Sequence, residues 1–276
     1  YGWLFYRKRE YAVFKQLIMK IDYHMHTYLS DGRDTHEQMI ASASYRGIEE
    51  MGFSDHVSIK PARWAIPIEN IDEMVRRVQT AQAENAHGLI IKFGVEMDYI
   101  PGMEKQIQEL IAKLPVDYVI GSVHFMDDWN FDTDVIEYDN IDINRFYRQY
   151  FKLVQQSAAS KLFDIIGHCD LAKKFAYYPS FSLNDLYEKT AQIFKKANVA
   201  VELNTSGRIK PCNEFYPSVP FLERLAYHKV PITLGSDAHI EQNVGQFFDD
   251  ALTMLKALGF KEIARFTKRQ REMVKI

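Results

Sequence analysis

Short apolar runs alternate with longer amphipathic segments along most of this sequence. The apolar runs are rich in β-branched and aromatic residues, as expected for strands, at residues 20–27, 49–56, 89–99, 117–125, 163–171, 199–206 and 230–239. Segments with helical periodicity lie between them, at residues 34–46, 69–86, 103–113, 142–160, 182–197, 217–228 and 244–257. Seven strand-then-helix units without a Gly/Ser-rich linker predict a single α/β domain with a parallel sheet, and this length favours a barrel over an open sheet.

The first eighteen residues, YGWLFYRKREYAVFKQLI, precede this pattern. They are aromatic and basic, without an apolar run long enough to cross a membrane and without the layout of a signal peptide. Met19 then opens the first predicted strand with MKIDYHMH. We therefore expect residues 1–18 to be a non-core extension and residues 19–276 to form the domain. The alternative is an amphipathic N-terminal helix that packs on the domain.

Composition narrows the class of protein. With 47% hydrophobic and 26% charged residues, the chain is typical of a soluble globular protein and not of a disordered or membrane protein. A formal net charge of -3 provides no basic field for nucleic acid. The two cysteines, Cys169 and Cys212, are too few for a disulfide scaffold and lack zinc-finger spacing, which favours a cytoplasmic location.

Polar residues gather at the carboxyl ends of the predicted strands. His24 and His26 stand one residue apart, so a strand would point both imidazoles the same way. The ends of the other strands carry Asp55 with His56, Glu96, His124, His168 with Asp170, Asp237 with His239, and, in the sixth strand, Glu202, Asn204 and Arg208. Because the carboxyl ends of barrel strands meet at one mouth, six histidines should converge there. The other three, His36, His87 and His228, are expected on the surface.

This constellation predicts a metal site. Six imidazoles interleaved with Asp31, Glu96 and Asp237 are costly to hold together unless cations compensate them. Imidazole and carboxylate ligands suit Zn, Mn or Fe, and such clusters hydrolyse esters by ionising water. A serine nucleophile at Ser206 would lack both an elbow motif and an adjacent base. A glycosidase pair of Glu96 and Glu202 would leave the histidines unexplained.

The motifs also resemble those of a known family. HMHTYLSDG, GFSDH, GVEMDY, GSVHF, GHCDL and GSDAH occur in the order that resembles the PHP (polymerase and histidinol phosphatase) superfamily. The resemblance implies a distorted (β/α)7 TIM-like barrel with a trinuclear metal centre. VELNTSGRIK followed by YPS is similar to the stand-alone histidinol-phosphate phosphatases, which implies hydrolysis of L-histidinol phosphate in histidine biosynthesis. The alternatives are a PHP phosphoesterase acting on nucleotides, oligonucleotides or phosphotyrosine, and a non-catalytic metal-binding module.

The resemblance further implies how three divalent ions would be held. The first would have the ligands His24, His26, Glu96 and Asp237. The second would share Glu96 as a bridge and add His124 and His168. The third would take His56, His239 and Asp31, and Asp31 stands where several relatives have a histidine. Among these ligands, Asp237, Glu96 and His239 are expected to be catalytic.

A phosphorylated small substrate needs cations beside the metals. Arginine offers a planar fork that binds two phosphate oxygens. By resemblance and position, Arg208 is the first candidate for phosphate binding, and Lys173 or Lys174 is the second. Arg33 and Arg63 lie in early loops that could also reach the mouth.

Overall fold

The computed structural model describes residues 19–133 and 135–276, so the predicted extension at residues 1–18 lies outside the described residues. Seven strands pair in parallel, and each lies beside the next in chain order. They are β1 (Ile21–Asp22), β2 (Glu50–Phe53), β4 (Ile90–Asp98), β5 (Tyr118–Ser122), β8 (Ile165–Ile166), β9 (Ala200–Asn204) and β10 (Ile232–Gly235).

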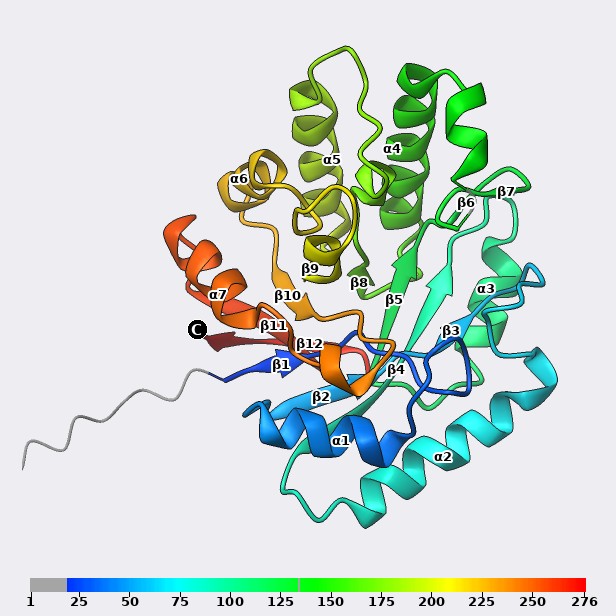
Figure 1. The fold of residues 1–276 in the computed structure, drawn as a ribbon, viewed down its shortest axis with the longest axis vertical. Helices are drawn as coiled ribbons and strands as arrows, with labels where there is room; N and C mark the ends of the chain where they lie inside the picture. Colours follow the sequence, from blue (N-terminus) through cyan, green and yellow to red (C-terminus); the bar gives the residue numbers. More distant parts are fainter. Residues whose placement is uncertain (1–18, 134) are drawn as a thin grey trace, which may run out of the picture.

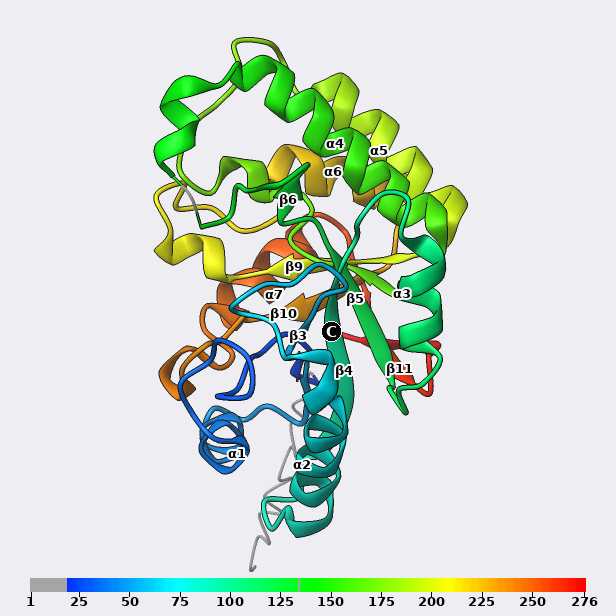
Figure 2. The same cartoon turned by 90° about the vertical axis from the view of Figure 1, so that its right-hand side faces the viewer.

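The first strand segment also meets the last, which closes the barrel. The backbone nitrogen of Tyr23 donates to the carbonyl of Leu234 at 3.2 Å, and that of His26 donates to the carbonyl of Ala238 at 2.8 Å. Helices surround the strands in both views of the molecule (Figures 1 and 2). The prediction of a distorted (β/α)7 TIM-like barrel in a single domain is confirmed; the distortion is evident in β1 and β8, which contain only two residues each.

The second predicted strand is interrupted in its middle. The chain leaves the sheet at Ser54 and Asp55 and returns as β3 (His56–Val57), which pairs with β4 beyond the segment that β2 occupies. The register places His56 directly beside Glu96. Because the register with β4 is the same on both sides of the interruption, the imidazole of His56 lies next to Glu96, which is 1% exposed.

All seven predicted helices are present. They are α1 (His36–Tyr45), α2 (Ile71–Glu84), α3 (Glu104–Ile111), α4 (Ile143–Ser160), α5 (Asn184–Ala197), α6 (Val219–Tyr227) and α7 (Phe248–Ala257). Short 3-10 turns occur at η1 (Ile68–Asn70), η2 (Ile136–Asn140), η3 (Leu171–Lys173), η4 (Ser206–Ile209) and η5 (Glu241–Asn243). Among the described residues, no helix combines the length and apolarity needed to cross a membrane.

A tyrosine fills the barrel below the mouth. Tyr118 is fully buried, and its hydroxyl donates to the carbonyl of Tyr23 at 2.6 Å. A Cβ atom on Gly52 of β2 or on Gly94 of β4 would collide with the Tyr118 side chain, so glycine is required at both positions. The interior is thus a packed core that supports the residues above it.

A C-terminal hairpin that the sequence pattern did not predict covers the opposite end of the barrel. It consists of β11 (Glu262–Thr267) and β12 (Gln270–Lys275). Arg269 pairs with Asp164 at 2.8 Å, and its backbone nitrogen donates to the carbonyl of Asp117 at 2.7 Å. Both aspartates immediately precede barrel strands, so the hairpin lies across the amino ends. A smaller hairpin, β6 (Phe125–Met126) with β7 (Trp129–Asn130), follows β5 at the mouth.

The three histidines expected on the surface differ in their surroundings. His87 is exposed, and His228 is half-buried beside Glu188 at 2.7 Å. His36 is 2% exposed, and its ring lies 4.5 Å from that of Phe53, so the surface prediction for His36 is wrong. The first turn of α1 points this imidazole toward the sheet.

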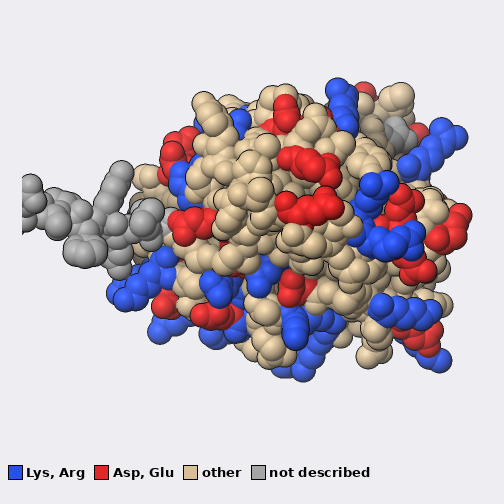
Figure 3. All heavy atoms as spheres, turned by 90° about the horizontal axis from the view of Figure 1, so that it is seen from below, with Lys and Arg blue, Asp and Glu red and all other residues tan. Residues whose placement is uncertain are grey.

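On the face in Figure 3, basic and acidic side chains are interspersed.

Candidate metal centre

The nine side chains predicted as metal ligands converge at the barrel mouth. They fall into four overlapping groups, and within each group one ligand atom per residue lies within 4.8 Å of all the others. The groups are His26, Asp31, His56 and His239; His24, His26 and Glu96; His24, His168 and Asp237; and His56, Glu96 and His124. Residues spread from position 24 to position 239 are therefore assembled into one cluster.

Glu96 lies between the two halves of this cluster. It is 1% exposed on β4. Its Oε1 lies 2.9 Å from Nε2 of His168, while its Oε2 lies 3.1 Å from Nε2 of His24 and 2.9 Å from Nδ1 of His56. Each carboxylate oxygen faces a different set of imidazoles, which is the arrangement that a bridging ligand requires.

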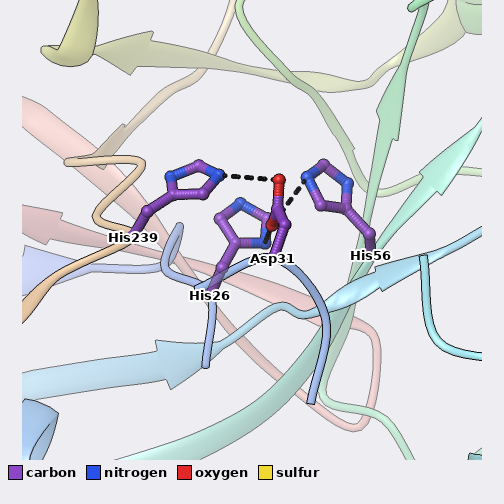
Figure 4. A group of neighbouring side chains, drawn as sticks. All are labelled: His26, Asp31, His56 and His239. Atoms are coloured by element: carbon purple, nitrogen blue, oxygen red, sulfur yellow. Dashed lines mark ion pairs between the residues drawn. The ribbon is translucent and has the colours of Figure 1, made fainter. Parts of the chain in front are cut away.

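Asp31 lies between two histidines at the outer edge of the cluster (Figure 4). Its Oδ1 is 3.6 Å from Nε2 of His56, and its Oδ2 is 3.3 Å from Nε2 of His239. Asp55 holds the loop that carries Asp31: it accepts hydrogen bonds from the backbone and hydroxyl of Thr27 at 2.7 and 2.9 Å, and from the hydroxyl of Ser30 at 2.6 Å. The buried carboxylate of Asp55 thus fixes the loop that carries the more exposed carboxylate of Asp31.

Two further carboxylates orient imidazoles by contacting their Nδ1 atoms. Glu202 lies 2.6 Å from Nδ1 of His24, and Asp98 lies 2.8 Å from Nδ1 of His124. A carboxylate on one ring nitrogen fixes the tautomer and leaves the other nitrogen for a metal. The sequence interpretation placed Glu202 at the mouth and considered it as a glycosidase acid, but it did not predict that Glu202 orients a histidine, and it missed Asp98. Strand alternation could have indicated Asp98, because it lies two residues beyond Glu96 on the same face of β4.

Asp237 is fixed on both sides. Its Oδ1 lies 3.3 Å from Nε2 of His26, and its Oδ2 accepts hydrogen bonds from Asn204 at 3.2 Å and from Ser206 at 3.1 Å. Its backbone adopts a φ of 53°, in the left-handed region that aspartate tolerates better than most residues. Residues held in this region are enriched at functional sites.

The donor atoms of the cluster fit divalent cations. Within the described residues, Nε2 of His24, Nε2 of His26 and Oε2 of Glu96 are buried without a hydrogen-bond partner. Burial opposes charge on both His24 and Glu96, yet Glu202 and Glu96 raise the pKa of His24, and the imidazoles lower the pKa of Glu96 well below its usual value. Buried polar atoms without a partner are costly, and bound cations would satisfy the lone pairs of neutral imidazole nitrogens and carboxylate oxygens.

A cavity of about 270 Å³ opens above the cluster. Its lining includes His56, Glu96, His124, His168, Asp237 and His239, together with Trp64, Asn130, Asp132, Lys174, Tyr216 and Lys210. A small molecule could therefore contact the cluster and these walls simultaneously.

The residues predicted to bind phosphate are not all placed at this cavity. Lys174 lines it. Arg208 is exposed outside the lining, and its guanidinium lies 5.4 Å from the ring centre of Phe215. Lys173 is buried in ion pairs with Asp170 at 3.0 Å and Glu214 at 2.8 Å.

The early-loop arginines, Arg33 and Arg63, are exposed and are not part of the lining either. The sequence interpretation missed Lys210, although it lies two residues beyond Arg208 in the same turn. Only the path of η4 shows that Ile209 and Lys210 face the cavity while Arg208 does not.

Comparisons with known proteins agree with this architecture. The PHP domain family model matches residues 22–206. A Deinococcus radiodurans protein named "Probable histidinol-phosphatase" is 35% identical over 261 residues, covering 91% of this chain and 97% of that protein. The histidinol-phosphatase of Lactococcus lactis is 26% identical over 264 residues, covering 90% of this chain and 94% of that protein.

A solved structure shares the fold. The crystal structure of histidinol phosphate phosphatase from Lactococcus lactis, complexed with zinc, L-histidinol and phosphate, has a TM-score of 0.80 and 24% identity, covering 92% of this chain and 98% of that one. A parallel barrel with imidazoles and carboxylates at its mouth is typical of metal-dependent hydrolases. The chain belongs to the PHP domain family.

Proposed function

We propose that this protein is a metal-dependent phosphomonoesterase that hydrolyses L-histidinol phosphate to L-histidinol and phosphate. The observation that carries the proposal is the position of Glu96, whose two oxygens face separate sets of imidazoles on the floor of the cavity. The names of the relatives from Deinococcus radiodurans and Lactococcus lactis support the substrate. We also propose that the protein is cytoplasmic, as the sequence predicts.

The proposed centre holds three divalent ions, of Zn, Mn or Fe. The ligand sets are those implied by the family resemblance: His24, His26, Glu96 and Asp237; Glu96, His124 and His168; and Asp31, His56 and His239. The four groups of neighbouring ligand atoms contain the same nine residues in other combinations. When bound, such ions act as Lewis acids that ionise water near neutral pH and stabilise charge on phosphoryl oxygens. The chain's own residues supply the rest of the mechanism.

Three residues are proposed to be catalytic. Glu96 fixes the spacing of the two inner ligand sets. Asp237 is proposed to act as an ionised carboxylate that accepts a hydrogen bond at Oδ1, because the nearby imidazoles lower its pKa and Asn204 and Ser206 already donate to Oδ2. His239 is the most accessible imidazole of the cluster, with its side chain 38% exposed, and it faces the cavity, where it can contact the bound phosphoryl group.

The phosphate also needs a cationic side chain. Lys174 and Lys210 both line the cavity. The ammonium of Lys174 is already 2.6 Å from Asp132. We therefore prefer Lys210 as the phosphate-binding residue, in place of Arg208, whose side chain lies outside the cavity lining.

A substrate panel tests the proposed function. Protein loaded with Zn or Mn would be assayed for phosphate release from histidinol phosphate, nucleoside monophosphates, oligonucleotides and phosphotyrosine. The highest kcat/KM is expected for histidinol phosphate, and Glu96→Gln should abolish it, whereas Glu109→Gln on the exposed face of α3 should not. A clear preference for another ester would overturn the substrate assignment, and loss of activity in Glu109→Gln would indicate a non-specific effect.

A further inference from the structure

One carboxylate at the cavity is not part of the metal cluster. Among the described residues that line the cavity, Asp132 is the acid that belongs to none of the four ligand groups. It lies just beyond β7, and its side chain is 22% exposed. Its position beside the cluster, and outside the ligand groups, points to contact with a substrate.

The carboxylate is held in one orientation. Nζ of Lys174 donates to Oδ1 of Asp132 at 2.6 Å and to its backbone carbonyl at 2.8 Å. The backbone nitrogen of Asp132 donates to Oδ1 of Asn130 at 3.0 Å. These contacts occupy one carboxylate oxygen and leave Oδ2 available to a ligand.

Asp132 is suited to bind a cation and poorly suited to donate a proton. Burial alone would raise its pKa, but Lys174 and His124 lower it. An ionised carboxylate accepts hydrogen bonds and cannot protonate a leaving alkoxide. Hydrogen bonds between ionised groups are also about twice as strong as those between neutral groups.

An aromatic wall stands at the same cavity. Trp64 lines it, with its ring centre 4.6 Å from that of His56 and 5.4 Å from that of His124. Phe125 stacks on the indole at 6.0 Å with an angle of 25°. A flat aromatic surface next to a carboxylate suits a cationic group or a protonated ring.

We propose that Asp132 determines specificity: its Oδ2 accepts a hydrogen bond from a cationic nitrogen on the leaving group, so the site selects phosphate esters of amino alcohols over neutral esters. The inference rests on the proposed phosphomonoesterase function. Lys174 then acts as a positioning residue that orients Asp132, and Trp64 covers the apolar part of the leaving group. Phosphate and ammonium would then contact different residues of one small cavity.

Matched esters test this directly. The measured quantity is the ratio of kcat/KM for aminoethyl phosphate to that for ethyl phosphate, with histidinol phosphate assayed beside them. In Asp132→Asn the ratio should fall by about 10- to 100-fold, as expected when a charge-assisted hydrogen bond is lost. Asp128→Asn removes the same charge from the exposed turn between β6 and β7 and should leave the ratio unchanged.

Lys174→Gln is a second variant, in case Asp132→Asn folds poorly. If Lys174 orients Asp132, the ratio should fall in this variant too; if it binds phosphate, both esters should lose activity equally and the ratio should stay constant. Metal content, measured in each variant, should match the wild type. An unchanged ratio in Asp132→Asn, or a constant ratio in Lys174→Gln, overturns the inference while the phosphatase function stands. A wild-type protein that hydrolyses no phosphomonoester with Zn, Mn or Fe overturns both.

Discussion

The carboxylate of Glu202 lies 2.6 Å from Nδ1 of His24 and turns the opposite nitrogen of that ring toward Glu96, 3.1 Å away. Both side chains of the pair are almost fully buried. The other oxygen of Glu202 accepts hydrogen bonds from the backbone nitrogen of His168 at 2.9 Å and from Asn204 at 3.1 Å. Glu202 therefore cannot rotate freely, and it fixes one proposed ligand while contacting the backbone of another.

Replacing Glu202 should weaken the metal centre without removing a ligand. In Glu202→Gln a neutral amide would face His24, and loss of such an orienting partner typically lowers metal affinity or activity about 10- to 100-fold. Metal titration and kcat/KM for histidinol phosphate measure the effect. Glu223→Gln, on the exposed side of α6, is the matched control. Wild-type affinity and rate in Glu202→Gln would contradict the role.

Asp55→Asn should release the loop that carries Asp31. The new amide would direct a donor at Thr27 and Ser30, which are donors themselves, so stability should fall by about 1–3 kcal/mol. Urea unfolding measures this loss, and elemental analysis at a fixed free metal concentration should show reduced occupancy of the outer site. Asp72→Asn, exposed on α2, controls for the change of charge. Full occupancy with unchanged stability would show that Asp55 does not hold the loop.

Lys210 and Arg208 provide a direct comparison for phosphate binding. Lys210→Ala should raise KM for histidinol phosphate by about tenfold or more, since a charge-assisted hydrogen bond is lost. Arg208→Ala should leave KM close to the wild-type value, because its guanidinium packs over Phe215 outside the cavity lining. Steady-state kinetics on both variants decide between them. A large increase in KM for Arg208→Ala, with little change for Lys210→Ala, would identify Arg208 as the phosphate-binding residue instead.

Metal binding should release protons. Burial lowers the pKa of His124 and His239, but nearby carboxylates outweigh it and raise both values to about 9 in the metal-free site. Both rings are then protonated near pH 7, while metals bind neutral imidazole, so metal affinity should rise with pH up to about 9. The metal-free protein gains stability from these rings below the usual pKa of 6.5 and loses it as the pH rises through 9.

Calorimetric metal titrations at pH 7.5 in two buffers with different ionisation enthalpies measure the number of protons released. A binding enthalpy that does not depend on the buffer would contradict the predicted protonation.

The fold was largely predictable because most elements have a regular period. The C-terminal hairpin escaped prediction because its turn lacks the usual signal. Lys268 and Arg269 adopt φ values of 48° and 63°, at positions where Asn-Gly or Asp-Gly would normally announce a two-residue turn. Its partners, Asp117 and Asp164, are brought there only by tertiary contacts.

Site residues at the ends of strands were predictable, because the strand fixes where each side chain points. Site residues in turns were less predictable. Barrel geometry alone brings His24, His124 and His168 to one mouth. At η4, which contains Arg208 and is followed by Lys210, the choice between these two residues depends on side-chain directions that sequence does not specify. The burial of His36 depends likewise on how α1 docks against Phe53.

The most direct test of the metal-dependent function is elemental analysis of chelator-free protein, combined with its rate on histidinol phosphate. The wild type should contain more than one equivalent of divalent metal and up to three. Glu96→Gln should lose metal and nearly all activity while losing much less stability, because a neutral amide poorly replaces a carboxylate that faces two ligand sets. One equivalent or none, with full activity on histidinol phosphate, would contradict a polynuclear centre built around Glu96.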